Sequence, residues 1–364
     1  MIDRTGPFAS VYFDSTADSE DAARRLELRC RELREKLSAA GASERMLGAL
    51  GIALAAGPPD RERCGRALLS DQATVLVDDT LPEPPQQEIV RVSPLPYLLP
   101  LLEQRSRRAP HVVATVDPVG ADLRGVNGYG DTLTRTVCGI GHPVHRARHD
   151  RAHRATPRRT QDVLRHNVRT MAREVSGLAD RVGAVTVMLA GTPEVRSAVH
   201  AALATHYAES GTDTTGPSPT QRRIIELDGT GHGPDNGELN TQIDKIVAET
   251  TQLWRADLLA RYTATRARAD GLATAGLPDT AAALRESAVA QLFVDGAALD
   301  DRQILVGDGH TQVATSAHEL TGPAELRRAD EAVPVAAIAG DSDIVPVDGE
   351  LTLPDGVGAL LRPR

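Results

Sequence analysis

A short segment in the middle of the chain concentrates side chains that could bind phosphate. Residues 142–159 contain six arginines and four histidines but one acidic residue, Asp150. A guanidinium group makes bidentate hydrogen bonds with phosphate oxygens and stacks on unpaired bases, so the segment suits contact with nucleic acid. Taken by itself, such a run of charge is more often a solvated segment that binds nothing. The candidate RNA-binding residues are His142, His145, Arg146, Arg148, His149, Arg151, His153, Arg154, Arg158 and Arg159.

The histidines of this segment could also form a metal-binding edge. His142, His145, His149 and His153 are spaced by three, four and four residues, which would place them along one side of a helix. Pro143 and the interleaved arginines oppose this interpretation, because proline disfavours a helix and positive neighbours repel a dication. We therefore expect no metal ion and no cofactor.

Support for catalysis in the sequence is weak. Gln161 lies just beyond the basic segment and could orient a water molecule, but no glycines precede it. The surface of a helical first turn is the simpler interpretation of this residue. The signatures GxSxG, HExxH and GxxxxGKS/T, which mark common hydrolases and nucleotide triphosphatases, do not occur. We predict no catalytic residue.

The overall charge of the chain opposes general attraction to a polyanion. Its 364 residues include 41 lysines and arginines against 50 aspartates and glutamates, for a net charge of −9. Basic groups must therefore be concentrated locally if the protein is to bind nucleic acid, as they are in residues 142–159. The hydrophobic share of 41% and the charged share of 25% are typical of globular proteins, and the length indicates two or three domains.

Cysteine usage and hydropathy predict a cytoplasmic protein. Cys30, Cys64 and Cys138 are scattered and form no CxxC pair, which fits reduced thiols. The first residues contain no basic stretch followed by an apolar run, and no stretch of about 18 apolar residues occurs anywhere. We expect neither secretion nor a membrane span.

The elements around the basic segment predict a sheet flanked by helices. Turn residues at 127–130 separate two alternating strands, which is a hairpin signal. A long helix is expected after the segment, at about 160–181, and the alternation of strands and helices continues beyond it. The expected strands are 111–116, 121–126, 132–137, 184–189 and 222–227, with a second helix at 193–207.

Two further domains are expected on either side. The predicted boundaries separate an N-terminal α/β domain at 1–107, a middle α/β domain at 108–228 and a C-terminal α/β domain at 229–364. The N-terminal domain should contain strands at 8–13, 66–69 and 74–77 and helices at 19–37 and 46–55. The C-terminal domain should contain helices near 243–262, 277–287 and 324–329 and strands at 289–294, 303–306 and 333–338.

Several stretches of the sequence resemble a known family. They are residues 6–14 (GPFASVYFD), 66–69 (RALL), 94–101 (PLPYLLPL), 117–122 (DPVGAD), 141–145 (GHPVH), 271–284 (GLATAGLPDTAAAL), 328–338 (RADEAVPVAAI) and 355–361 (DGVGALL). Their order along the chain and their residues resemble those of the bacterial branch of the archaeo-eukaryotic release-factor and pelota family, in particular its actinobacterial and ribosome-hibernation members. The resemblance covers most of the chain, and its specificity comes from the sum of the stretches.

The resemblance implies three α/β domains arranged as a mimic of tRNA. In that family the N-terminal domain faces the decoding centre, the middle domain faces the peptidyl-transferase centre, and the C-terminal domain faces the stalk base. The implied partner is the ribosome, through rRNA of the A site and the peptidyl-transferase centre, with a translational GTPase as a further partner. A monomer without membrane contact is expected.

The chain departs from true release factors at the site of chemistry. Those proteins carry Gly-Gly-Gln in the loop after the hairpin, whereas this sequence has the basic segment at 142–159 and no Gly-Gly-Gln. Because arginines cannot position a hydrolytic water as that glutamine loop does, we expect A-site binding without peptide release. Two alternatives stay open: a peptidyl-tRNA hydrolase that uses Gln161 or a loop histidine, and a stress-linked scaffold whose acidic C-terminal domain binds a protein.

Overall fold

The chain combines helices with several sheets, which confirms the predicted α/β class. A computed structural model describes residues 6–16, 22–55, 64–104, 108–140, 157–209, 222–229 and 237–363. Two compact units are present: residues 1–106 with 259–364 form the first unit, and residues 107–258 form the second. The division into three domains at 1–107, 108–228 and 229–364, and their arrangement as a tRNA mimic, stay predictions.

The N-terminal part of the first unit is an antiparallel sheet of order β3-β2-β1-β4. Successive side chains of a strand point to opposite faces, and β1 uses both. Val11 and Phe13 pack against α1 and α2, whereas Tyr12 packs in the core shared with the C-terminal part. The elements are β1 (Phe8–Asp14), α1 (Ala22–Ala39), α2 (Glu44–Ala55), β2 (Gly65–Ser70), β3 (Val75–Leu81), β4 (Ile89–Ser93) and α3 (Leu99–Gln104).

The C-terminal part of the first unit has two small sheets, of order β10-β16-β11-β15 and β13-β12-β14. The elements are β10 (Ala273–Ala275), α7 (Leu277–Arg285), β11 (Val289–Val294), α8 (Gly296–Leu299), β12 (Gln303–Val306), β13 (Val313–Ala314), η2 (Ala317–Glu319), β14 (Glu325–Arg328), α9 (Ala329–Ala339), β15 (Asp343–Pro346), η3 (Pro354–Gly356) and β16 (Val357–Leu361). The buried helix α9 lies in the core that both parts share.

Two predictions for this part are wrong. The helix expected at 324–329 is the strand β14, which pairs with β12, and the strand expected at 333–338 lies inside the helix α9. Nearly all of α9 is buried, so it shows no polar face and no 3.6-residue period. A short apolar run without a period is compatible with a buried strand or a buried helix, and only packing distinguishes them.

An ion-pair network joins the two parts of the first unit. Arg91 in β4 donates from Nη1 to Asp330 over 2.7 Å and from Nη2 to Asp300 over 2.9 Å. Its guanidinium carbon also lies 3.6 Å from the centre of the Tyr97 ring. Because Asp330 is fully buried, its charge needs this partner to be tolerated in the interior.

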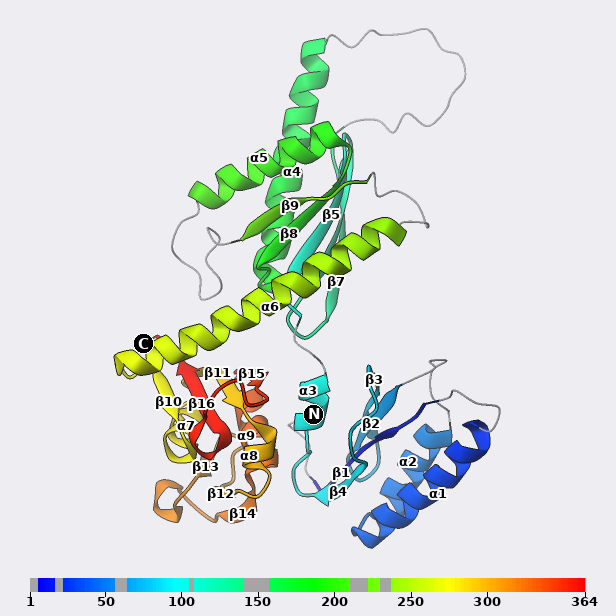
Figure 1. Ribbon diagram of the computed structural model, residues 1–364, viewed down its shortest axis with the longest axis vertical. Helices are drawn as coiled ribbons and strands as arrows, with labels where there is room; N and C mark the ends of the chain where they lie inside the picture. The colour runs from blue at the N-terminus through cyan, green and yellow to red at the C-terminus, as the bar shows by residue number, and fades with distance from the viewer. Residues whose placement is uncertain are drawn as a thin grey trace. The chain divides into compact units, whose positions relative to one another are not determined.

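The second unit is built on a mixed sheet of order β7-β6-β5-β8-β9. The strands β5, β8 and β9 run parallel, and β6 and β7 add an antiparallel hairpin (Figure 1). This agrees with the expected hairpin and with the expected alternation. The elements are β5 (His111–Asp117), β6 (Gly120–Val126), β7 (Thr132–Cys138), α4 (Pro157–Val182), β8 (Thr186–Gly191), α5 (Pro193–Glu209), β9 (Arg223–Glu226) and α6 (Gly237–Arg268), of which α6 continues into the first unit beyond residue 258.

The two faces of this sheet are covered unequally. α4 and α5 cover one face through a continuous apolar core that includes Met171 and Val175. On the other face, Leu239 and Val247 of α6 pack against Met188 of β8 and neighbouring residues. The part of that face formed by β6 and β7 lies beside α6 and forms a groove. Among the described residues, no helix is both long enough and apolar enough to cross a membrane.

Candidate functional site

The basic segment is inserted between β7 and α4. The β6–β7 hairpin pairs in register from Val126 with Thr132 to Gly120 with Cys138. One residue beyond β7, the backbone N–H of Gly139 still donates to the carbonyl of Val119 over 2.7 Å. The hairpin therefore keeps its geometry up to the residue from which the chain leaves the sheet.

Asn167 of α4 binds the backbone at the residue where the chain leaves the sheet. Its side chain is fully buried, and its Oδ1 accepts the backbone N–H of Ile140 over 2.8 Å. Its Nδ2 donates to the carbonyl of Pro118 over 2.9 Å and to the carbonyl of Ile140 over 3.1 Å. One amide thus uses its acceptor and both its donors on backbone groups of the β5–β6 turn and of residue 140, which fixes residue 140 relative to α4.

Gly139 is required by this contact. A Cβ at residue 139 would lie 2.5 Å from Cγ of Asn167 and 2.7 Å from its Nδ2, closer than packed atoms approach. Gly120, on the neighbouring strand, is equally constrained, because a Cβ there would lie 2.2 Å from the carbonyl oxygen of Val137. The absence of a side chain at residue 139 lets α4 approach the hairpin closely, and its absence at residue 120 lets β6 and β7 pair closely.

The predicted binding residues fall almost entirely outside the described part of the chain. His142, His145, Arg146, Arg148, His149, Arg151, His153 and Arg154 lie outside it. Arg158 and Arg159 belong to the first turn of α4, where their side chains are not among those described, and that turn contains no acidic residue. Gln161 follows on the exposed surface of α4, as the sequence indicated. The RNA-binding role of the segment stays a prediction.

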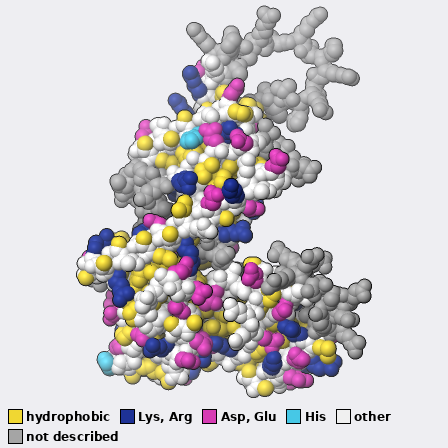
Figure 2. All heavy atoms as spheres, viewed as in Figure 1, with side chains coloured by type: hydrophobic (Ala, Val, Ile, Leu, Met, Phe, Trp, Pro, Cys, Tyr) yellow, Lys and Arg dark blue, Asp and Glu magenta, His cyan; other side chains and the backbone are white. Residues whose placement is uncertain are grey.

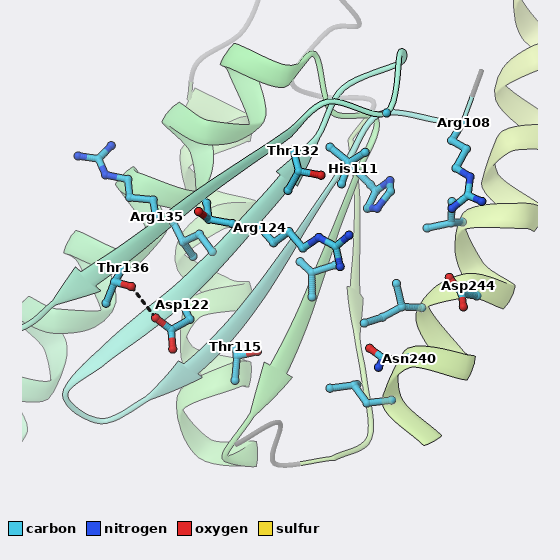
Figure 3. Close-up of a pocket in the computed structure, with 18 residues that line it drawn as sticks. Arg108, His111, Thr115, Asp122, Arg124, Thr132, Arg135, Thr136, Asn240 and Asp244 are labelled. Carbon is cyan, nitrogen blue, oxygen red and sulfur yellow. Dashed lines mark hydrogen bonds between the residues drawn. The ribbon is translucent and has the colours of Figure 1, made fainter. Parts of the chain in front are cut away.

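A groove of about 960 Å³ lies in the second unit between the β5–β7 face of the sheet and α6 (Figure 3). Strand register places Val113, Arg124 and Thr134 side by side across its floor. The lining residues are Arg108, His111, Val113, Thr115, Asp122, Leu123, Arg124, Val126, Gly130, Thr132, Thr134, Arg135, Thr136, Leu239, Asn240, Ile243, Asp244 and Val247. Three arginines and two aspartates give this lining no strong net charge.

Two titratable side chains of the groove, His111 and Asp122, have defined hydrogen bonds. Burial lowers the pKa of His111 below its ordinary value, although the hydrogen bond that its Nδ1 donates to the carbonyl of Ala109 over 2.9 Å acts in the opposite direction. This is the only hydrogen bond of the His111 ring within the described part of the chain. Asp122 accepts from the hydroxyl of Thr136 over 2.8 Å. Among the described residues, the His111 ring makes no hydrogen bond with a hydroxyl group.

Sequence reasoning did not identify Asn167 or the groove. A signal for Asn167 was present, since this amide interrupts the apolar stripe of the helix between Leu164 and Met171. A polar residue on a buried face usually has a specific hydrogen-bonding role. The groove gave no comparable signal, because its α6 residues are far in the sequence from the β5, β6 and β7 residues that they face.

Comparisons with known proteins identify the family. The model for bacterial archaeo-eukaryotic release factor family 2 matches residues 110–268. The uncharacterized proteins MT2704 and Rv2629 of two Mycobacterium tuberculosis strains are each 33% identical to this chain over 373 residues, covering 100% of it and 95% of the relative.

Solved structures similar to this chain come from archaea and yeast. The archaeal translation termination factor aRF1 is 13% identical, with a TM-score of 0.24, over 99% of this chain and 93% of that one. Ribosome-bound archaeal Pelota is 14% identical, with a TM-score of 0.39, over 98% and 90%. S. cerevisiae Dom34 is 8% identical, with a TM-score of 0.39, over 82% and 79%. On the family match and the full-length relatives, the chain belongs to the bacterial archaeo-eukaryotic release factor family.

Proposed function

We propose that this protein is a translation factor that binds the ribosomal A site and does not release the nascent peptide. The observation that supports the proposal is the replacement of the family's Gly-Gly-Gln loop in the sequence by a basic segment. A family of release factors is defined by chemistry at a Gly-Gly-Gln loop, and this member has residues 142–159 at that place in the sequence, with no Gly-Gly-Gln anywhere.

The composition of the segment favours binding over hydrolysis. Peptide release needs a water molecule held beside a flexible loop, whereas six arginines supply charge and bidentate donors for phosphate. They are concentrated in a chain whose net charge is −9, so they form its strongest local attraction to RNA.

The contacts of Asn167 hold the backbone just before the basic segment. Three hydrogen bonds from this side chain hold the backbone of residues 118 and 140, next to the point where the basic segment begins. Both ends of the segment are therefore attached to one rigid body, since α4 also receives its C-terminal end. Such anchoring reduces the conformational entropy lost when the segment binds a surface.

We further propose the biological setting of this activity. Occupying the A site without releasing a peptide would silence or protect a ribosome, so the protein would act in ribosome hibernation during stress. It would work in the cytoplasm as a monomer, and a translational GTPase is the class of partner that would deliver it.

The proposal is tested by co-sedimentation with 70S ribosomes. We expect the wild type to pellet with ribosomes, and a variant with the six segment arginines changed to alanine to pellet much less. The matched control removes the same charge from six exposed arginines elsewhere: Arg31, Arg34, Arg45, Arg181, Arg223 and Arg261. Equal binding by the segment variant and the control would contradict the role of the segment.

A release assay separates binding from hydrolysis. Ribosomes carrying a labelled peptide on P-site tRNA are incubated with the wild type, and we expect no release above background. Release that disappears in Gln161→Ala would instead establish the protein as a peptidyl-tRNA hydrolase and reject the proposal of a non-hydrolytic factor.

A further inference from the structure

The helix α4 exposes a row of arginines on the side opposite its core contacts. Arg165, Arg169 and Arg173 are all exposed, and they follow one another at intervals of four residues. At 100° per residue they lie within about 80° of one another around the helix axis, and each is about 6 Å further along it. We call these three residues the arginine face. Val168, Met171 and Val175 occupy the buried side of the same turns.

Two members of the arginine face have no partner in the described part of the chain. Arg165 lies 3.8 Å from Asp162, and both side chains are about three-quarters exposed, at 73% and 74%. The side chains of Arg169 and Arg173 make no hydrogen bond or ion pair among the described residues. The acidic residue next to Arg173, Glu174, is already paired with Arg135 over 2.6 Å.

Two members of the arginine face, Arg169 and Arg173, do not serve the stability of α4. Like charges four residues apart repel and destabilise a helix, and neither Arg169 nor Arg173 has a carboxylate three or four residues away. The first turn of α4 adds Arg158 and Arg159 without any acidic residue, at the end where the helix dipole favours negative charge. An arrangement that costs helix stability is best explained by a partner that supplies the missing negative charge.

We propose that the arginine face binds the phosphate backbone of RNA, as a continuation of the basic segment along α4. This inference rests on the proposed function and assigns the RNA contact to described residues outside residues 142–159. Regularly spaced guanidinium groups match a regularly spaced chain of phosphates, each of which can accept two parallel hydrogen bonds. In Figure 2, basic side chains are visible at the upper end of the second unit, where Figure 1 draws the N-terminal half of α4.

The salt dependence of binding gives a quantitative expectation. Each phosphate that is neutralised contributes about 0.7 to the slope of log affinity against log salt concentration for single-stranded nucleic acid. Losing three contacts should therefore reduce the magnitude of the slope by about 2. Because this contribution vanishes near 1 M salt, the loss corresponds to about a hundredfold weaker binding at about 0.1 M salt.

The experiment measures ribosome affinity across a range of potassium chloride concentrations for three full-length proteins. These are the wild type, the triple variant Arg165→Gln, Arg169→Gln, Arg173→Gln, and a control with Arg181, Arg223 and Arg261 changed to glutamine. We expect the reduced slope in the triple variant alone, with a melting temperature no lower than that of the wild type. Equal slopes in the triple variant and the control would overturn the inference while leaving the proposed function standing; a wild type that does not bind would overturn both.

Cross-linking distinguishes RNA from a protein partner. A photoreactive amino acid at residue 169 should form a covalent cross-link to rRNA on irradiation, so the protein should be recovered in the rRNA fraction. Cross-links that go to ribosomal proteins alone would show that the arginine face contacts an acidic protein surface, and this outcome would reject RNA as the partner.

Discussion

Replacing Asn167 with alanine should destabilise the second unit and loosen the start of the basic segment. The change deletes three hydrogen bonds, of 2.8, 2.9 and 3.1 Å, and leaves one backbone N–H and two backbone carbonyls without their protein partner. A hydrogen bond of this kind contributes about 1 kcal/mol net, and a buried group without a partner costs about 1–3 kcal/mol. Ile140 and Pro118 are themselves exposed, so water can replace part of the loss. We expect a decrease of about 3 kcal/mol in the free energy of unfolding.

The contact of Asn167 with Gly139 allows a stricter test by a double-mutant cycle. Gly139→Ala alone should cost about 1–3 kcal/mol, because the new Cβ would overlap the Asn167 amide at 2.5 Å. In the Asn167→Ala background that amide is absent, so the same Cβ fits. The two changes should therefore cost less together than the sum of their separate costs, by about 1–2 kcal/mol.

Urea unfolding followed by tryptophan fluorescence provides the assay. Trp254 is the single tryptophan of the chain, and it lies in the portion of α6 that belongs to the second unit. Asn240→Ala is the matched control, because this exposed helical asparagine should change stability by less than about 0.5 kcal/mol. A decrease below about 1 kcal/mol in the free energy of unfolding for Asn167→Ala would refute the role of Asn167 in holding the backbone of residues 118 and 140. Strict additivity in the cycle would refute it as well.

Two further predictions concern buried charge. Burial lowers the pKa of His111 below its ordinary value of 6.5, so the unfolded state takes up a proton first, and stability should fall as the pH drops below about 6.5. In urea unfolding between about pH 7 and pH 5, His111→Gln should reduce the change of the free energy of unfolding with pH. An unchanged pH dependence would contradict the role of His111. In the first unit, Arg66 is 3% exposed and donates to both carboxylate oxygens of Asp78, over 2.8 and 2.9 Å, and to the carbonyl of Ala53. Asp78→Ala leaves this guanidinium without its counter-charge, and because Asp78 is 41% exposed we expect the free energy of unfolding to fall by about 2–3 kcal/mol. Thermal unfolding followed by circular dichroism measures this change. A decrease below about 1 kcal/mol would show that water compensates the charge.

The elements of the second unit were predictable because their signals are local. The turn at residues 127–130 and the alternation on either side of it predict the β6–β7 hairpin, and the apolar period predicts α4. The same holds for β1, whose aromatic and β-branched residues suit a strand buried on both faces. These signals arise within a few residues, so they do not depend on the rest of the fold.

The sequence alone also identified the family resemblance, the concentration of arginine in residues 142–159 and the absence of Gly-Gly-Gln. Composition and short motifs are readable without coordinates. The assignment of RNA contact to those residues stays a prediction.

Tertiary structure decided the features that join distant residues. The amide of Asn167 binds backbone groups 27 and 49 positions away, and Arg91 meets Asp330 across 239 positions. Packing likewise decided that residues 329–339 form the buried helix α9, although their apolar run suits a strand equally well. Local sequence sets the conformational preference of a few residues, whereas a buried polar group or an apolar run acquires its role from the partners that the completed fold brings within contact distance.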